Sequence, residues 1–478
     1  MEFYRALPEI FILGMACLIL MVDTFIKQRR LVLTYTLTQL TLIAVFILSL
    51  MQFNTQTYIG FHGTFIRDHF TTLLELVIYL TTFVVFLFSR DYILDRTNLG
   101  RGEYYVLGLF SMLGMMVLVA AHSLITIYLG LELLSLPLYA MVAMKRDDGR
   151  ATEAAMKYFV MGALASGMLL YGMSLIFGAT HSIDLAQIAQ MITTHHAQMP
   201  ILMLGLVFLI AGIAFKLGVV PFHMWLPDVY TGAPISVVLF VSTAPKIAAF
   251  AMAVRLLVEM LPTLHMQWQP LLILLAILSM GLGNFLAIAQ TNIKRMLAYS
   301  GIAHIGYMLL GLIAGTQVGY SSALFYMIAY VFMALAAFSM LILLSRKGFE
   351  CEQISDLQGL NTRSPWLALM MLFIMFSMAG IPPFIGFFAK LSVLEALINV
   401  HLVWLAVVAM VFAIVGVFYY LRVVKVMYFE KPEVDDLIDW GLDRRVILST
   451  NAMALLFFGV FPSGLYALCQ YAFLGWHF

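Results

Sequence analysis

The chain has 478 residues, of which 63% are hydrophobic and 11% charged, and its formal net charge is +1. Soluble domains have about 45–50% apolar and about 25% charged residues, so this composition excludes an ordinary soluble protein and indicates a surface largely in lipid. The near-neutral charge gives no electrostatic reason to expect nucleic acid or acidic substrates.

The three cysteines, Cys17, Cys351 and Cys469, lie far apart and form no CxxC pair. We therefore expect no disulfide framework, iron–sulfur cluster or zinc site. Neither a GxGxxG between a strand and a helix nor a GxxxxGK[ST] signature is present, so nucleotide binding is unsupported. We predict no cofactor and no metal in this chain, and we assign the many methionines to packing.

Apolar stretches of about 20 residues, the length that crosses a bilayer, occur about fourteen times. The first has no small-residue cleavage site, so we expect a retained span and not a signal peptide. The predicted spans are Phe3–Asp23, Leu31–Leu50, Thr71–Ser89, Tyr104–Ala121, Leu124–Met144, Thr152–Phe177, Ile201–Tyr230, Pro234–Met260, Leu271–Ala289, Met296–Ala314, Ser321–Leu344, Trp366–Ile398, Leu402–Val424 and Val446–Tyr471.

The seventh and twelfth spans are too long for one straight crossing, and both contain helix breakers. Pro221 cannot donate to the carbonyl of Leu217, and the Pro382-Pro383 pair leaves the carbonyls of Met378 and Ala379 free. Freed backbone groups at membrane depth need water or polar neighbours. We therefore expect two broken helices, with hydrated half-channels beside Lys216 and Lys390.

Lysine and arginine concentrate in alternate loops, as the positive-inside rule requires of consecutive crossings. Loops after even-numbered spans are nearly free of them, with Arg67 as the main departure, and the loop after span seven also lacks them. Both termini are therefore predicted to face the periplasm or its equivalent. The charges after the odd-numbered spans are Lys27, Arg29, Arg30, Arg90, Arg96, Arg101, Lys145, Arg146, Arg150, Lys294, Arg295, Arg346, Lys347, Arg363, Lys425, Lys431, Arg444 and Arg445.

An internal repeat is indicated by two similar loops. The segment His181–Leu185 resembles Glu352–Leu357, and the same offset of about 172 residues carries Glu132 onto His304. Spans four to eight would then match spans nine to thirteen. Because five is an odd number, the second copy enters the membrane inverted, and inverted repeats with corresponding broken helices are typical of transporters.

The predicted fold is an all-α polytopic membrane protein with about fourteen transmembrane helices, two inverted five-helix repeats and broken helices 7 and 12. We expect residues 1–102 to form helices one to three and residues 103–262 the first repeat. Residues 263–428 would form the second repeat, and residues 429–478 a loop and the last helix.

Five ionisable residues lie near the middle of predicted spans, where a charge costs about 2.5 kcal/mol or more and usually marks a pathway. They are Glu132, Lys216, Lys246, His304 and Lys390. Burial weakens a lysine's hold on its proton, whereas a nearby carboxylate strengthens it. Lys216 would keep its proton when it faces Glu132 and release it when the two separate, so we hypothesise a proton relay. A structural salt bridge is the alternative for any single buried lysine.

Other ionisable residues leave structural and functional readings open. Lys157 lies near the start of its span, where snorkelling to the interface competes evenly with function. Arg255 and Glu259 have i,i+4 spacing and are expected to form a structural pair. The remaining candidates for either a polar pathway or a structural contact are Glu75, His223, Asp228 and Glu395.

Three motifs resemble those of the antiporter-like subunits of respiratory complex I. Residues 216–230 read K-L-G-V-V-P-F-H-M-W-L-P-D-V-Y, like the family's broken seventh helix. Residues 290–300 read Q-T-N-I-K-R-M-L-A-Y-S, like the start of its tenth helix, and residues 380–390 read G-I-P-P-F-I-G-F-F-A-K, like its broken twelfth helix. The resemblance spans essentially the whole chain.

Within that family, the lysine at position 390 differs from the glutamate usual in subunit M, and the chain has no room for the long extension of subunit L. It resembles the N branch most. The resemblance implies that Glu132 and Lys216 are an input pair, that Lys246 and His304 continue a polar axis, and that Lys390 serves the output. It also implies subunits M and K as neighbours. NADH, FMN, iron–sulfur clusters and quinone would be bound by other subunits.

Two other functions remain open at this stage. One is a cation/proton antiporter subunit of the Mrp type, driven by ion gradients and not by electron transfer. The other is a structural spacer, in which the buried charges would be dispensable.

Overall fold

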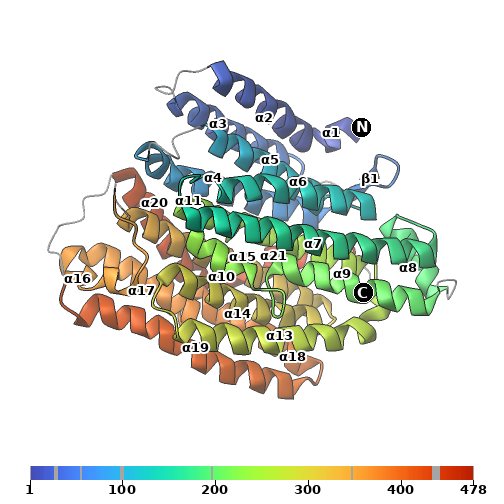
Figure 1. Ribbon diagram of the computed structural model, residues 1–478. Helices are drawn as coiled ribbons and strands as arrows, with labels where there is room; N and C mark the ends of the chain where they lie inside the picture. Colours follow the sequence, from blue (N-terminus) through green and yellow to red (C-terminus); the bar gives the residue numbers. More distant parts are fainter. Residues whose placement is uncertain are drawn as a thin grey trace. The chain divides into compact units, whose positions relative to one another are not determined.

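The computed structural model describes residues 2–25, 31–53, 56–96, 102–194, 198–345, 348–432 and 442–476, which are predominantly helical (Figure 1). The chain forms two compact units. The first consists of Met1–Leu217, Gly232–Leu271 and Tyr471–Phe478, and the second of Gly218–Thr231 and Leu272–Gln470. Six charges that carry the predicted orientation lie outside the described residues: Lys27, Arg29, Arg30, Arg101, Arg346 and Lys347.

The first unit contains most of the N-terminal half. Its elements are α1 (Glu2–Arg5), α2 (Leu7–Phe25), α3 (Leu31–Leu50), β1 (Tyr58–Gly60), β2 (Phe65–Arg67), α4 (His69–Leu94), α5 (Glu103–Val119), α6 (Leu124–Val142), α7 (Gly149–Thr180), α8 (Leu185–Thr193), α9 (Met199–Leu217), α11 (Ile235–Val241), α12 (Ala244–Ala253), the π-helix η2 (Val254–Glu259) and the 3₁₀ turn η3 (Pro262–Leu264).

The second unit contains most of the C-terminal half and the short helix after the α9 break. Its elements are α10 (Trp225–Gly232), most of α13 (His265–Ile288), α14 (Ile293–Ile313), α15 (Gln317–Leu344), the 3₁₀ turn η4 (Ile354–Leu357), α16 (Leu360–Arg363), α17 (Pro365–Ala379), α18 (Ile385–Asn399), α19 (Val403–Phe429), α20 (Leu442–Val460) and α21 (Pro462–Ala472).

Eleven helices of the described chain are long and apolar enough to cross a membrane, and the bent pair α20–α21 makes twelve if it counts as one span. The predicted count of about fourteen is therefore larger than the number supported by length and composition. The difference arises because α5 is only 17 residues long and the predicted twelfth span is divided into α17 and α18, each of 15 residues.

Both predicted helix breaks are present. Helix α9 ends at Leu217 and α10 begins at Trp225, while α17 ends at Ala379 and α18 begins at Ile385. Gly380 follows α17 with φ +81°, a left-handed conformation that glycine adopts at no steric cost and that ends the helix. Each break exposes the carbonyls of the helix before it, so each needs a donor.

The same loop contact recurs once in each unit. In the first, Ser123 caps α6 and pairs with Asp184, which caps α8. In the second, Asn292 caps α14 and pairs with Gln353. Both partners are displaced by 169 residues, so Asp184 corresponds to Gln353 and not to the predicted Asp356. The side chain of Asp356 instead accepts from the Glu352 and Gln353 amides.

The position of Arg67 in the hairpin β1–β2 explains why this residue departs from the alternation of loop charges. Arg67, at the end of β2, is 1% exposed and forms ion pairs with Glu9 of α2 at 3.1 Å and Glu75 of α4 at 2.7 Å. Its charge is neutralised inside the fold and is not available to hold a loop on one side of a membrane. For Glu75, which the sequence left open, the structure supports a structural contact.

Candidate functional site

Lys216 lies in the last turn of α9 and is 8% exposed. Its ammonium donates to the Ser135 hydroxyl of α6 at 2.6 Å. Glu132 precedes Ser135 by one turn on the same face of α6 and acts electrostatically on Lys216, but no ion pair within 4.0 Å joins these two described residues. The Glu132 carboxylate instead accepts from Ser166 of α7. The two predicted partners are therefore near each other without direct contact.

Lys246 lies in the first turn of α12 and is 3% exposed. Its ammonium donates at 2.6 Å to the carbonyl of Leu217, the last residue of α9. This is the carbonyl that Pro221 was predicted to leave free. A lysine thus supplies the polar neighbour that the break requires, and the positive charge is favoured at the negative end of the α9 dipole.

Lys390 of α18 meets the second break in the same way. Its ammonium donates to the carbonyl of Ala379 at 2.8 Å and lies 3.4 Å from that of Met378, the two carbonyls predicted to be free. The ring of Tyr307 lies 5.3 Å from the ammonium, within the range of a cation–π contact. Lys390 forms no ion pair within the described part of the second unit.

His304 lies in the middle of α14 and is 3% exposed. Its ring nitrogen Nδ1 is 2.8 Å from the hydroxyl of Tyr326, and Nε2 is 3.1 Å from the hydroxyl of Tyr420. Tyr420 also shares a hydrogen bond of 2.5 Å with Ser300. The histidine is therefore connected through hydroxyl groups, which can each accept one proton while donating another.

The sequence did not single out the hydroxyl groups around the buried charges. Ser135 could have been found, because it stands three residues after Glu132 and shares its helix face. Ser166, Tyr326 and Tyr420 had no comparable signal, since each comes from a different helix. Their positions depend on packing between elements distant in sequence.

The secondary candidates lie in different surroundings. Lys157 is 42% exposed and pairs with Glu153 at 2.9 Å, which supports a surface contact. Glu395 is exposed on α18. Asp228 of α10 lies 3.7 Å from Arg295, and His223 lies in the turn before α10 with Nδ1 buried and without a hydrogen-bond partner. The predicted structural pair Arg255 and Glu259 is confirmed at 2.8 Å.

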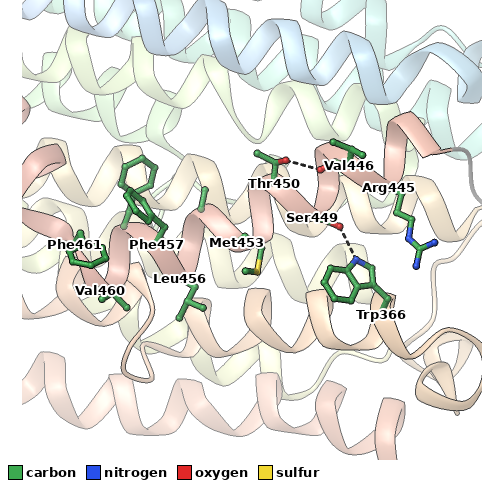
Figure 2. Close-up of a pocket in the computed structure, with 12 residues that line it drawn as sticks. Trp366, Arg445, Val446, Ser449, Thr450, Met453, Leu456, Phe457, Val460 and Phe461 are labelled. Atoms are coloured by element: carbon green, nitrogen blue, oxygen red, sulfur yellow. Dashed lines mark hydrogen bonds between the residues drawn. The ribbon is translucent and has the colours of Figure 1, made fainter.

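A groove of about 990 Å³ lies in the second unit, between α20 and Trp366 of α17 (Figure 2). Figure 2 shows the Trp366 indole donating to Ser449, with Met453 and Phe457 further along the same helix. The lining is mostly apolar and includes none of the five predicted relay residues. No group of three or more metal-binding side chains occurs among the residues that the structure describes.

Known proteins are similar to this chain in sequence and in fold. The family model for the transmembrane region of NADH:quinone oxidoreductase and Mrp antiporters matches residues 121–416. The NADH-quinone oxidoreductase subunit N of Coxiella burnetii is 57% identical over 480 residues, covering 99% of each chain.

Two solved structures are similar over nearly the whole chain. A chain of respiratory complex I from Thermus thermophilus with bound aureothin is 30% identical, has a TM-score of 0.83, and is matched over 97% of this chain and 99% of that one. A chain of the Mrp complex from Dietzia, at 20% identity, TM-score 0.86 and coverage of 99% and 97%, shares the fold. Because the sequence identity to the curated relative extends over the full length, this chain belongs to the subunit N family of NADH-quinone oxidoreductase.

Proposed function

We propose that this chain is a proton-translocating membrane-arm subunit of NADH:quinone oxidoreductase. Electron transfer from NADH to quinone in other subunits would drive proton movement through its buried Lys, Glu and His residues. The observation that carries the proposal is the position of Lys246 and Lys390, whose ammonium groups each meet the carbonyl end of a broken helix. A charge that meets such carbonyls responds to the local arrangement of the backbone, so movement of the break changes the lysine's hold on its proton.

In the first unit, Glu132 and Lys216 form the proposed input pair. Ser135 accepts from Lys216 and Ser166 donates to Glu132, so two hydroxyls keep the charges near each other without a direct ion pair. Approach of Glu132 favours the protonated lysine, and withdrawal favours proton release. Lys246 receives the proton at the end of α9.

In the second unit, His304 and Lys390 perform the corresponding steps. His304 bonds to Tyr326 and Tyr420, which can reorient to pass a proton, and Lys390 serves as the output group. No carboxylate pairs with Lys390 among the described residues of this unit. Its charge is therefore governed by the carbonyls of α17 and by Tyr307.

The proposed topology has about fourteen transmembrane helices in a bacterial inner membrane, with both termini periplasmic. Adding α5 and the broken pair α17–α18 to the twelve spans supports that count. Two inverted repeats, residues 103–262 and 263–428, are supported by the matching loop pairs Ser123–Asp184 and Asn292–Gln353. The parts 1–102 and 429–478 would flank them.

Antiporter-like subunit M and the small subunit K are the proposed neighbours in the membrane. NADH, FMN, iron–sulfur clusters and quinone would be bound by partner subunits. The residues of the proposed relay are amines, a carboxylate and an imidazole with hydroxyl neighbours, which are suited to carrying protons.

The decisive experiment measures proton pumping in membrane vesicles that contain the assembled complex with Lys216→Ala. We expect pumping to fall by roughly 100-fold while assembly is retained, because the proton carrier is lost. The matched control is Lys145→Ala, which removes an exposed lysine paired with Asp148. Unchanged pumping with normal assembly would instead support the structural spacer.

An Mrp-type cation/proton antiporter subunit is the second candidate, supported by the shared family model and the shared fold. Addition of NADH to vesicles separates the two functions. Proton uptake that requires NADH and quinone supports the first candidate, whereas uptake driven by a sodium gradient alone supports the second. Neighbouring genes for iron–sulfur and quinone-site subunits would also support the first candidate.

A further inference from the structure

A second charged cluster in the first unit lies at the ends of the helices that carry Glu132 and Lys246. His122 stands two residues before α6, the helix of Glu132. Glu259 ends η2, which continues directly from α12, the helix of Lys246. The imidazole Nδ1 of His122 lies 3.0 Å from Oε1 of Glu259, so this one pair joins the two helix ends.

Arg255 of η2 links Glu259 to Asp68 and completes the cluster. Its guanidinium lies 2.8 Å from Oε2 of Glu259 and 2.9 Å from Oδ2 of Asp68, and donates to Oδ1 of Asp68 and to Thr71 at 3.0 and 2.8 Å. Arg255 is fully buried and Asp68 and His122 are 6% and 3% exposed. The Glu259 side chain is 17% exposed and gives the cluster its contact with the exterior.

The charges in this cluster do not balance unless a proton is added. Although burial opposes ionisation of Asp68, Arg255 and the Thr71 amide hold its pKa below the usual range, so Asp68 is a carboxylate. One guanidinium then faces two carboxylates, leaving one negative charge in a poorly hydrated place. A proton on His122 cancels it, and histidine is the side chain that titrates near neutral pH.

The surroundings of His122 show what such a proton would hold together. Its amide donates to the carbonyl of Thr64 in the β1–β2 turn, and its carbonyl accepts from Leu185 at the start of α8. Asp184, paired with Ser123 beside His122, is the charged group that α8 contributes. The hairpin, α6, α8 and η2 therefore meet at this histidine.

We propose that His122 and Glu259 form a proton-binding site whose occupancy fastens the end of α6 to η2. When the proton is bound, an imidazolium–carboxylate pair joins the helices of Glu132 and Lys246. When it is lost, the pair becomes a neutral histidine beside an excess carboxylate. The bound proton supplies the charge that stabilises the junction, so the junction is more stable at low pH than at high pH. This site is separate from the proposed lysine relay and does not depend on it.

Hydrogen exchange of the intact complex, measured by mass spectrometry at about pH 5 and about pH 8 and corrected for intrinsic rates, tests the site. In the wild-type protein, we expect the first turn of α6 and the η2 segment to exchange about tenfold more slowly at the lower pH, because a contact between charged groups is stronger than one between neutral groups. His122→Gln should abolish that difference. His122→Arg, which carries a permanent charge, should give slow exchange at both pH values.

Two further variants keep the test decisive. Glu259→Gln retains side-chain shape and leaves Arg255 with Asp68, and it should also abolish the pH effect. His401→Asn, at an exposed turn of the second unit with φ +63°, should leave the pH effect unchanged, and asparagine tolerates that conformation. A pH-independent wild type, or a pH effect that survives His122→Gln, would overturn the proposal. Neither result depends on whether the complex pumps protons.

Discussion

Two buried lysines lie at the break after α9 in the first unit, and one of them, Lys246, meets the end of the helix; in the second unit, Lys390 meets the end of α17. Lys246 donates to the last carbonyl of α9, which leaves Lys216 to interact with Ser135 and, electrostatically, with Glu132. In the second unit, Lys390 donates to the carbonyl of Ala379 and lies 3.4 Å from that of Met378, the last two carbonyls of α17. The first arrangement separates the group that completes the broken helix from the group that responds to a carboxylate.

The difference between the two regions concerns what controls each charge. A carboxylate on a neighbouring helix can move relative to Lys216, so its effect can be switched. Lys390 instead faces backbone dipoles and an aromatic ring, which are fixed by α17 and by Tyr307 of α14. We therefore expect Lys390 to be sensitive to the geometry of the break and Lys216 to be sensitive to Glu132.

The largest effect is expected for Lys390→Met, because one substitution removes both the proposed carrier and the donor to α17. Proton pumping should fall by roughly 100-fold. The unsatisfied carbonyls should also cost about 1–3 kcal/mol locally, detectable as faster hydrogen exchange at the end of α17. Lys390→Arg should restore the exchange rate without restoring pumping, since arginine donates but does not release its proton. Leu391→Ala, at a neighbouring exposed position, is the control.

Glu132→Gln tests whether the first region is controlled by a carboxylate. The amide can still bond to Ser166 but carries no charge, so Lys216 loses its electrostatic partner. We expect pumping to fall by about tenfold, less than for loss of a lysine, with normal assembly. Initial pumping rates in vesicles measure this effect. Wild-type rates in the variant would show that the two regions are not controlled differently.

Ser135→Ala tests the contribution of the Ser135 hydroxyl to proton pumping separately from that of the Glu132 charge. Lys216 would lose a neutral acceptor worth about 1 kcal/mol, so pumping should change by no more than about fivefold. Ser111→Ala is the matched control, because the Ser111 hydroxyl of α5 donates to the carbonyl of Leu134 on α6, the helix that carries Ser135. An effect as large as that of Glu132→Gln would instead make Ser135 a proton-carrying member of the site.

The smallest effect is expected at Asp148, which caps α7, the helix of Ser166, far from that serine in sequence. Asp148→Ala should cost about 1 kcal/mol locally and speed exchange in the first turn of α7 about fivefold, with pumping unchanged. The hydrogen bond with Lys145 lowers the pKa of Asp148, so its stabilisation is present above the unfolded-state pKa and lost as pH falls through the folded value. Reduced pumping would show that positioning of α7 limits the first region.

Much of the fold could be predicted because lipid imposes a simple rule on sequence. Long apolar stretches must become helices, and α9 and α17 end shortly before Pro221 and the Pro382-Pro383 pair, as predicted, although Pro137 and Pro270 lie within unbroken helices. The number of crossings was less secure. Hydropathy does not show that helix α5 is short, whereas the division of the twelfth span was predicted from the Pro382-Pro383 pair.

Individual charges were harder to interpret than the pattern they form. Arg67 departs from the alternation of loop charges, but Glu9 of α2 and Glu75 of α4 neutralise it. The echo of Asp184 at Asp356 was displaced by three residues, because the structural counterpart is Gln353. In both cases a contact between distant segments decided the outcome.

The sequence by itself determined that this is a membrane protein with buried amines beside two helix breaks, since burial of charge and loss of a backbone donor are properties of the residues themselves. It also identified the carbonyls of Leu217, Met378 and Ala379 as those in need of partners. Only the tertiary structure decided that lysines fill that need, and that Lys246 meets α9 while Lys216 meets Ser135. The position of a proline in the sequence identifies which carbonyl loses its helical donor. The group that replaces this donor comes from whichever helix packs against the carbonyl, and packing depends on the tertiary structure.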